Sequence, residues 1–132
     1  MQQYWVVGAA FGGKDDALTT FKRRGYWYCW DANKHHAVDA ATQPSVARQQ
    51  ERLKMISVGD RIAVKRLLGQ GSKEIAILAL GIVTDVDTDE WRVYVNWVVD
   101  PVDRRVPIHG CAASIHGPFS GDDPWVQQVF QL

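Results

Sequence analysis

IAILALGIVTDV, residues 75–86, is an almost continuous apolar run with one glycine, Gly81, inside it. Such a run is typical of a strand that is buried on both faces, and the glycine indicates a bend in it. On either side, residues 61–68 and 91–99 alternate apolar with other side chains, which predicts two more strands. Turn-forming residues separate the three segments. We therefore expect three consecutive strands that form a meander.

The segments before this meander predict one strand and two helices. Residues 4–9, YWVVGA, are mostly β-branched or aromatic, and we expect them to form a central strand. A short helix follows, because the aspartates at 15–16 precede an apolar pattern that ends in basic residues and Gly25. A second helix is expected from Pro44 to about Met55.

The segments after the meander are less regular. Residues 101–107 are expected to form a basic loop, residues 110–119 show no strong period, and residues 123–130 predict a short last helix. The sum is a single α+β domain over residues 1–132. We expect five or six strands and two or three short helices around a curved or barrel-like sheet.

Composition narrows the classes of function. Fifteen basic and fifteen acidic residues cancel, so charge alone does not hold this chain on nucleic acid and any such contact must be local. The sequence shows no signal peptide and no apolar run of membrane length, so no membrane contact is expected. Cys29 and Cys111 lack CxxC or metal-ligand spacing, and we interpret them as free thiols in a reducing cytoplasm.

Residues that could catalyse a reaction are scattered. The four histidines, which have no metal-ligating spacing, are His35, His36, His109 and His116. Cys29 has no neighbouring base that would activate it as a nucleophile. The aspartate pairs at 15–16 and 122–123 each precede a helix, where carboxylates cap exposed backbone amides. We therefore expect a protein without enzymatic activity, metal or other cofactor.

Aromatic residues give a stronger signal. The stretch GYWYCWD, residues 25–31, packs four aromatic side chains into five positions. Alternation along a strand predicts two faces, with Tyr26, Tyr28 and Trp30 on one and Trp27 and Cys29 on the other. The chain has six tryptophans, which together suggest an aromatic cage that holds a nucleobase face-on. For any one tryptophan, a place in the core is the alternative.

Three basic clusters are candidates for binding phosphates. They are Lys22, Arg23 and Arg24; then Arg61, Lys65, Arg66 and Lys73; then Arg104 and Arg105. If the clusters gather at one pocket, they bind phosphates while the aromatic residues hold a base. The alternative is three separate solvated faces.

Five short motifs appear in a characteristic order. They are YWVVGA (4–9) with GGKDD (12–16), Phe21 with GYW (25–27), GDRIAVK (59–65), GIV (81–83) and VNW (95–97). Together they resemble the EVE-type domain of the PUA-like superfamily. The similar version is the one at the amino terminus of AAA+ GTPase subunits in McrBC-type restriction systems.

This resemblance implies a PUA-like sheet or small barrel that takes a modified base, flipped out of the nucleic acid, into an aromatic cage. The implied base-binding residues are Gly8, Gly12, Gly13, Trp27, Trp30, Asp31, Asn96 and Trp97. The residues expected to contact the nucleic-acid backbone are Lys14, Arg24, Lys65 and Arg66.

The function that the resemblance implies is a non-enzymatic reader of a modified nucleobase, that is, a protein that binds the base without altering it. Methylated DNA is the expected ligand, within a bacterial modification-dependent restriction or antiviral defence system. Since the chain has no GxxxxGK[ST] motif, cleavage would come from a AAA+ GTPase or nuclease, as a partner or a fused domain. One alternative is a PUA-like module that binds modified RNA, a nucleotide or a small signalling ligand. Another is a small hydrolase of the PUA-like ASCH group, with Lys65 beside Asp31.

Overall fold

The computed structural model describes residues 2–11, 15–28, 44–69, 71–110 and 115–131. Its strands are β1 (Tyr4–Gly8), β2 (Ala10–Phe11), β3 (Asp15–Asp16), β4 (Tyr26–Trp27), β5 (Arg61–Leu67), β6 (Glu74–Asp87), β7 (Arg92–Val99), β8 (Arg104–Pro107) and β9 (Ile115–Phe119). Its helices are α1 (Leu18–Arg24), α2 (Pro44–Lys54) and α3 (Pro124–Phe130). The described chain is therefore α+β.

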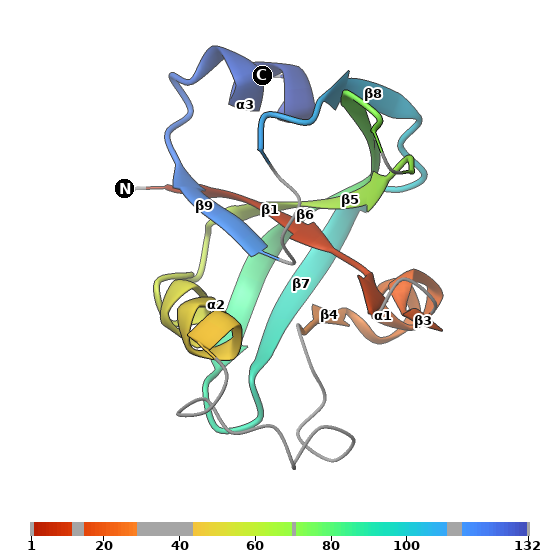
Figure 1. The fold of residues 1–132 in the computed structure, drawn as a ribbon. Helices are drawn as coiled ribbons and strands as arrows, with labels where there is room; N and C mark the ends of the chain where they lie inside the picture. Colours follow the sequence, from red (N-terminus) through yellow and green to blue (C-terminus); the bar gives the residue numbers. More distant parts are fainter. Residues whose placement is uncertain (1, 12–14, 29–43, 70, 111–114, 132) are drawn as a thin grey trace.

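Seven of the strands form one mixed sheet in the order β4-β7-β6-β5-β1-β9, and β8 pairs with the beginning of β6. β1 runs parallel to β5, and the other pairs in this sheet are antiparallel. β2 and β3 form a separate two-stranded sheet. Figure 1 shows α3 near the top of the molecule, with α1 and α2 lower down on either side of β7.

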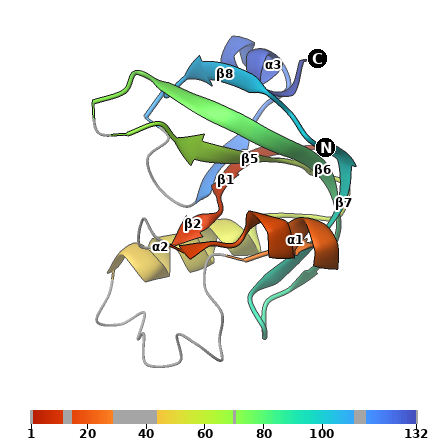
Figure 2. The same ribbon diagram turned by 90° about the vertical axis from the view of Figure 1, so that its right-hand side faces the viewer.

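Two apolar cores lie on opposite faces of the sheet, and alternate residues of β1 belong to different cores. Trp5 and Val7 pack in the first core with residues of α1 and α2, whereas Tyr4 and Val6 pack in the second core with α3. In Figure 2, the turned view separates α1 and α2 from α3. Alternation along a strand thus explains why β1 is buried on both faces.

The apolar run in β6 also contributes to both cores, and a bulge changes which of its residues face each core. Val64 of β5 pairs with Ala79, but the next residue of β5 pairs with Ile77, so Leu78 is the extra residue. Ile77 and Leu80 consequently lie in the second core, while Ala79 lies in the first. A one-residue bulge reverses which face each later side chain occupies.

The predicted meander is confirmed as β5, β6 and β7, and the three predicted helices are confirmed as α1, α2 and α3. The barrel alternative is wrong for the described residues, because β4 and β9 end the strand order without pairing with each other. The expected count of five or six strands was too low. Residues 101–107 contain β8 and residues 110–119 contain β9, both of which depend on distant partners in β6 and β1.

The predicted helix caps differ in outcome. Asp123 caps α3, since its side chain accepts a hydrogen bond from the Trp125 backbone N–H at 2.8 Å. The cap predicted at Asp15–Asp16 is wrong, because these residues form β3 and Ala17 is the N-cap of α1, with no side-chain cap.

Candidate functional site

The predicted aromatic stretch begins at the end of α1 and continues as β4. Gly25 has a left-handed backbone conformation with φ 73°, and its N–H donates to the Phe21 carbonyl at 2.8 Å. This C-cap ends the helix and turns the chain into an edge strand of the described sheet. β4 then pairs with β7, placing Tyr26 opposite Tyr94 and Trp27 opposite Val93.

The two faces of β4 have different surroundings. The Trp27 side chain is fully buried in the first core, and its indole N–H donates to the Gly8 carbonyl at 2.8 Å. Tyr26 is partly exposed, and its ring centroid lies 5.8 Å from that of Tyr28. The exposed aromatic surface of β4 is therefore on the Tyr26 side, whereas Trp27 occupies the core.

Trp97 is a partly exposed ring held in a fixed position. Its indole N–H donates to the Phe21 carbonyl at 3.0 Å, which ties β7 to the end of α1. Gly81 makes room for the ring, because a Cβ added there would lie 3.0 Å from Trp97 Cε3 and 2.3 Å from Val95 Cγ1. The adjacent Asn96 is exposed and lies on the opposite face of β7.

The structure does not bring the two predicted cage walls together. Trp27 pairs with Val93, four residues before Trp97 on β7, which corresponds to about 13 Å along the strand. Both side chains lie on the Val93 face, but Trp27 is fully buried and offers no exposed ring face to a base beside Trp97. Gly8 contacts Trp27 through its carbonyl. Predicted site residues 12–14, 30 and 31 lie outside the described residues.

A shallow hollow of about 510 Å³ lies beside α1, lined by Arg23, Arg24, Tyr26 and Tyr94. We call this the Arg–Tyr hollow. The Arg92 guanidinium lies 4.8 Å from the Tyr26 ring centroid. The predicted basic clusters included Arg23 and Arg24, but neither Arg92 nor Tyr94 was among the predicted site residues. The signal was the alternation Arg92, Tyr94, Asn96 along one face of a strand.

The three basic clusters do not gather at one place. Lys22 forms an ion pair with Asp100 at 2.8 Å, Arg61 donates to the Gly59 carbonyl, and Arg104 donates to the Val129 carbonyl of α3. Arg23 and Arg24 remain at the Arg–Tyr hollow.

The two predicted phosphate-binding residues of β5 differ in exposure. Lys65 is buried, with 5% of its surface exposed, whereas Arg66 is exposed. Burial, then Lys65 and then Arg52 lower the pKa of His116 to about 4. Lys65 therefore offers little surface to a nucleic-acid backbone, and its charge acts on a neighbouring histidine.

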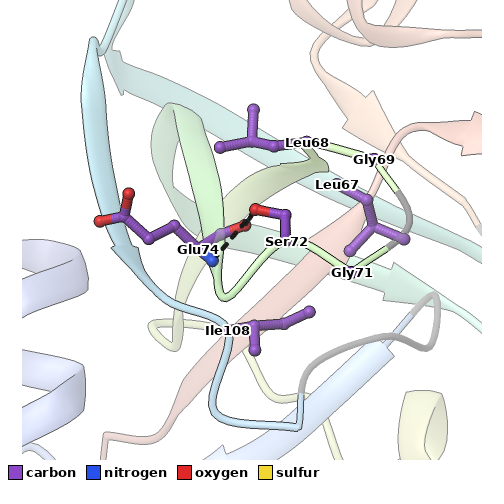
Figure 3. A pocket seen from close by; sticks show the side chains of 7 residues that line it. All are labelled: Leu67, Leu68, Gly69, Gly71, Ser72, Glu74 and Ile108. Atoms are coloured by element: carbon purple, nitrogen blue, oxygen red, sulfur yellow. Dashed lines mark hydrogen bonds between the residues drawn. The ribbon is translucent and has the colours of Figure 1, made fainter.

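A second hollow, of about 360 Å³, lies at the opposite end of β6 (Figure 3). Its wall is largely apolar and consists of Leu67, Leu68, Gly69, Gly71, Ser72, Glu74 and Ile108. Ser72 Oγ bridges Glu74 within the turn, accepting from its N–H and donating to its carbonyl. The seven described residues of this wall include neither an aromatic ring nor a cation, so a phosphate-bearing ligand fits the Arg–Tyr hollow better.

The described residues contain no group of three or more His, Cys, Asp or Glu side chains placed to hold a metal ion. Within the same residues, no helix combines the length and apolar character needed to cross a membrane. Both cysteines lie outside the described part of the chain. Comparison with protein-family models gave no match, and comparison with curated proteins gave none either.

Proposed function

We propose that this protein is a non-enzymatic reader of a modified nucleobase, acting on methylated DNA in a bacterial modification-dependent restriction or defence system. The base leaves the duplex and stacks on aromatic side chains near β4 and β7. The five motifs that resemble the EVE-type, PUA-like domain support this ligand class. In this proposal, a AAA+ GTPase or nuclease performs the cleavage.

The observation that carries the proposal is the fixed, partly exposed indole of Trp97. Its N–H is bound to the Phe21 carbonyl and its ring lies against Gly81, so the ring needs no reordering before a base stacks on it. Stacking on an aromatic side chain contributes about 1–3 kcal/mol per base. Trp27 has a supporting role, because it is buried and holds the Gly8 carbonyl.

The test is to measure binding of a methylated DNA duplex, its unmethylated counterpart, modified RNA and free nucleotides. We expect the methylated duplex to bind tightest and Trp97→Ala to weaken that binding about tenfold or more, because the stacking surface is lost. Trp91→Ala is the matched control, since Trp91 is also partly buried but lies at the other end of β7, near Lys54.

Trp27 needs a different substitution because its side chain is in the core. Trp27→Ala is expected to destabilise the fold by about 3–5 kcal/mol, whereas Trp27→Phe keeps an aromatic ring and removes only the N–H to Gly8. Thermal unfolding of each variant separates loss of binding from loss of fold. Full affinity in Trp97→Ala would contradict the proposed stacking role, and preference for free nucleotides would contradict the DNA-reader proposal.

A further inference from the structure

We propose that the Arg–Tyr hollow is a platform for single-stranded nucleic acid, with bases stacked on Tyr26 and Tyr94 and phosphates bound by Arg23 and Arg24. The inference deepens the proposed function and rests on it for the class of ligand. It assigns a separate surface to the unpaired nucleotides that flank the recognised base. This surface lies on the opposite face of β4 from Trp27.

Neighbouring side chains hold the tyrosine rings of the hollow in place. The Tyr26 ring centroid lies 6.0 Å from that of Phe21 and 6.4 Å from that of Tyr94, at angles of 71° and 70°. Phe21 is fully buried, whereas Tyr26 and Tyr94 are partly exposed. The Arg92 guanidinium also lies over Tyr26 and over Tyr28, at 4.8 and 5.3 Å from their ring centroids. Rings fixed in this way can accept a base with little loss of side-chain freedom.

The charge around the hollow favours an anion. Arg23 and Arg24 are both exposed on the last turn of α1. Lys22 of the same turn is engaged by Asp100 at 2.8 Å. Basic residues in a last turn also complement the helix dipole, which alone would explain their presence. The hollow and the adjoining tyrosines are the additional observations that point to a ligand.

Two carboxylates flank this surface on the β6 side. Asp85 pairs with Tyr94 and Asp87 pairs with Arg92, so both acidic residues lie on β6, across β7 from β4. Asp87 already accepts hydrogen bonds from the backbone of its own turn. Asp85 is exposed and is the carboxylate paired directly with a ring of the platform. A phosphate is therefore expected on the α1 side, away from Asp85.

A single strand of nucleic acid fits the hollow better than a free nucleotide does. Among the described residues, four side chains line a volume of about 510 Å³, and both arginines are exposed, so these four side chains do not enclose a small ligand. A nucleic-acid strand gains affinity because it makes several stacking and phosphate contacts at once. The exposed Asn96 extends the same face of β7 two residues beyond Tyr94 and offers an amide to a base edge.

The test measures binding of labelled single-stranded DNA and RNA oligonucleotides without modified bases, at several salt concentrations. In the double variant Arg23→Ala/Arg24→Ala, we expect weaker binding and a salt slope smaller by about 1.4, since each phosphate contact contributes about 0.7 for single strands. Arg105→Ala, an exposed arginine of β8, is the control and should bind as the unmodified protein does. Asp85→Asn should strengthen binding.

Removal of one ring tests stacking separately. Tyr94→Leu keeps an apolar side chain in a partly buried position and should lower affinity about fivefold or more at every salt concentration. Tyr94→Phe should retain binding. Thermal unfolding checks that the variants are folded.

Two results would overturn the platform. One is a double arginine variant with the affinity and salt slope of the unmodified protein, and the other is a free nucleotide that competes as well as an oligonucleotide. The reader function fails in a different way, through loss of the preference for a methylated base. If the protein binds single-stranded oligonucleotides but shows no preference for a methylated base, the reader proposal is contradicted and the platform proposal is not.

Discussion

Asp60 is a buried carboxylate, 2% exposed, that accepts three hydrogen bonds. Its Oδ1 accepts from the Gln3 backbone N–H at 3.1 Å, and its Oδ2 accepts from the Trp5 indole at 3.0 Å and the Ser57 backbone N–H at 2.9 Å. One side chain thus joins β1 to the turn before β5. Both oxygens are occupied, so the geometry indicates a structural role for this aspartate.

Asp60→Ala is expected to destabilise the fold by about 3–5 kcal/mol, because it leaves three donors without their acceptor and each buried donor costs about 1–3 kcal/mol. Urea unfolding measures this free energy. Asp60→Asn should destabilise the fold less than Asp60→Ala does, since an amide still accepts hydrogen bonds through one oxygen. Asp103→Ala, at an exposed aspartate, is the control. A loss for Asp60→Ala no larger than the control's would contradict the structural role.

At the scale of elements, β7 packs closely against Gly81 of β6. A Cβ there would lie 2.3 Å from Val95 Cγ1, 3.0 Å from the Asn96 carbonyl oxygen and 3.0 Å from Trp97 Cε3. The register of the two strands also shifts beside this glycine, between Leu80 and Gly81. The glycine thus lets a large ring lie across the neighbouring strand.

Gly81→Ala should therefore displace Trp97 and destabilise the fold by about 1–3 kcal/mol, as overpacking does. If Trp97 stacks on the modified base, affinity for the methylated duplex should fall as well. Ile75→Val is the control, because it lies at the far end of β6 in the second core and should cost about 1 kcal/mol without affecting affinity. Unchanged affinity in a folded Gly81→Ala variant would argue against Trp97 as the stacking surface.

Elements with their own periodicity could be predicted from the sequence, whereas elements defined by distant partners could not. The alternation in residues 61–68 and 91–99 predicted β5 and β7 to within one residue at each end. β8 and β9 are four and five residues long, contain prolines, and exist through pairing with β6 and β1. The sequence patterns within these two segments do not show that β6 and β1 are their partners.

The same distinction applies to the candidate site. Alternation predicted that Trp27 and Tyr26 face opposite sides, but burial depends on what packs against each side. α1 and Gly8 are brought there by the fold, and they leave Tyr26 beside a hollow and Trp27 in the core. Tyr94 joins the hollow because β7 pairs with β4, and the Arg92 guanidinium lies over the Tyr26 ring. The spacing of residues within one segment does not show that β4 pairs with β7.

At the scale of the whole molecule, two cationic side chains, Lys65 of β5 and Arg52 of α2, act on His116 of β9. His116 of β9 pairs with Val6 of β1, and on the other side of β1 lies β5 with the buried Lys65. Arg52 of α2 donates to the Ile115 carbonyl at 2.7 Å, which ties the helix to β9. Burial and these two cations make protonation of His116 unfavourable in the folded state.

Stability should consequently depend on pH. Burial first, then Lys65 and Arg52, lower the pKa of His116 from 6.5 to about 4, so the unfolded chain binds more protons between these values. The contribution is fully present above pH 6.5 and is lost as the pH falls towards 4. We expect a loss of about 1–2 kcal/mol after allowance for solvent screening, measured by urea unfolding from pH 7.5 to 4.5. His116→Gln should remove this part of the dependence. An identical slope in both proteins would show that other groups cause it.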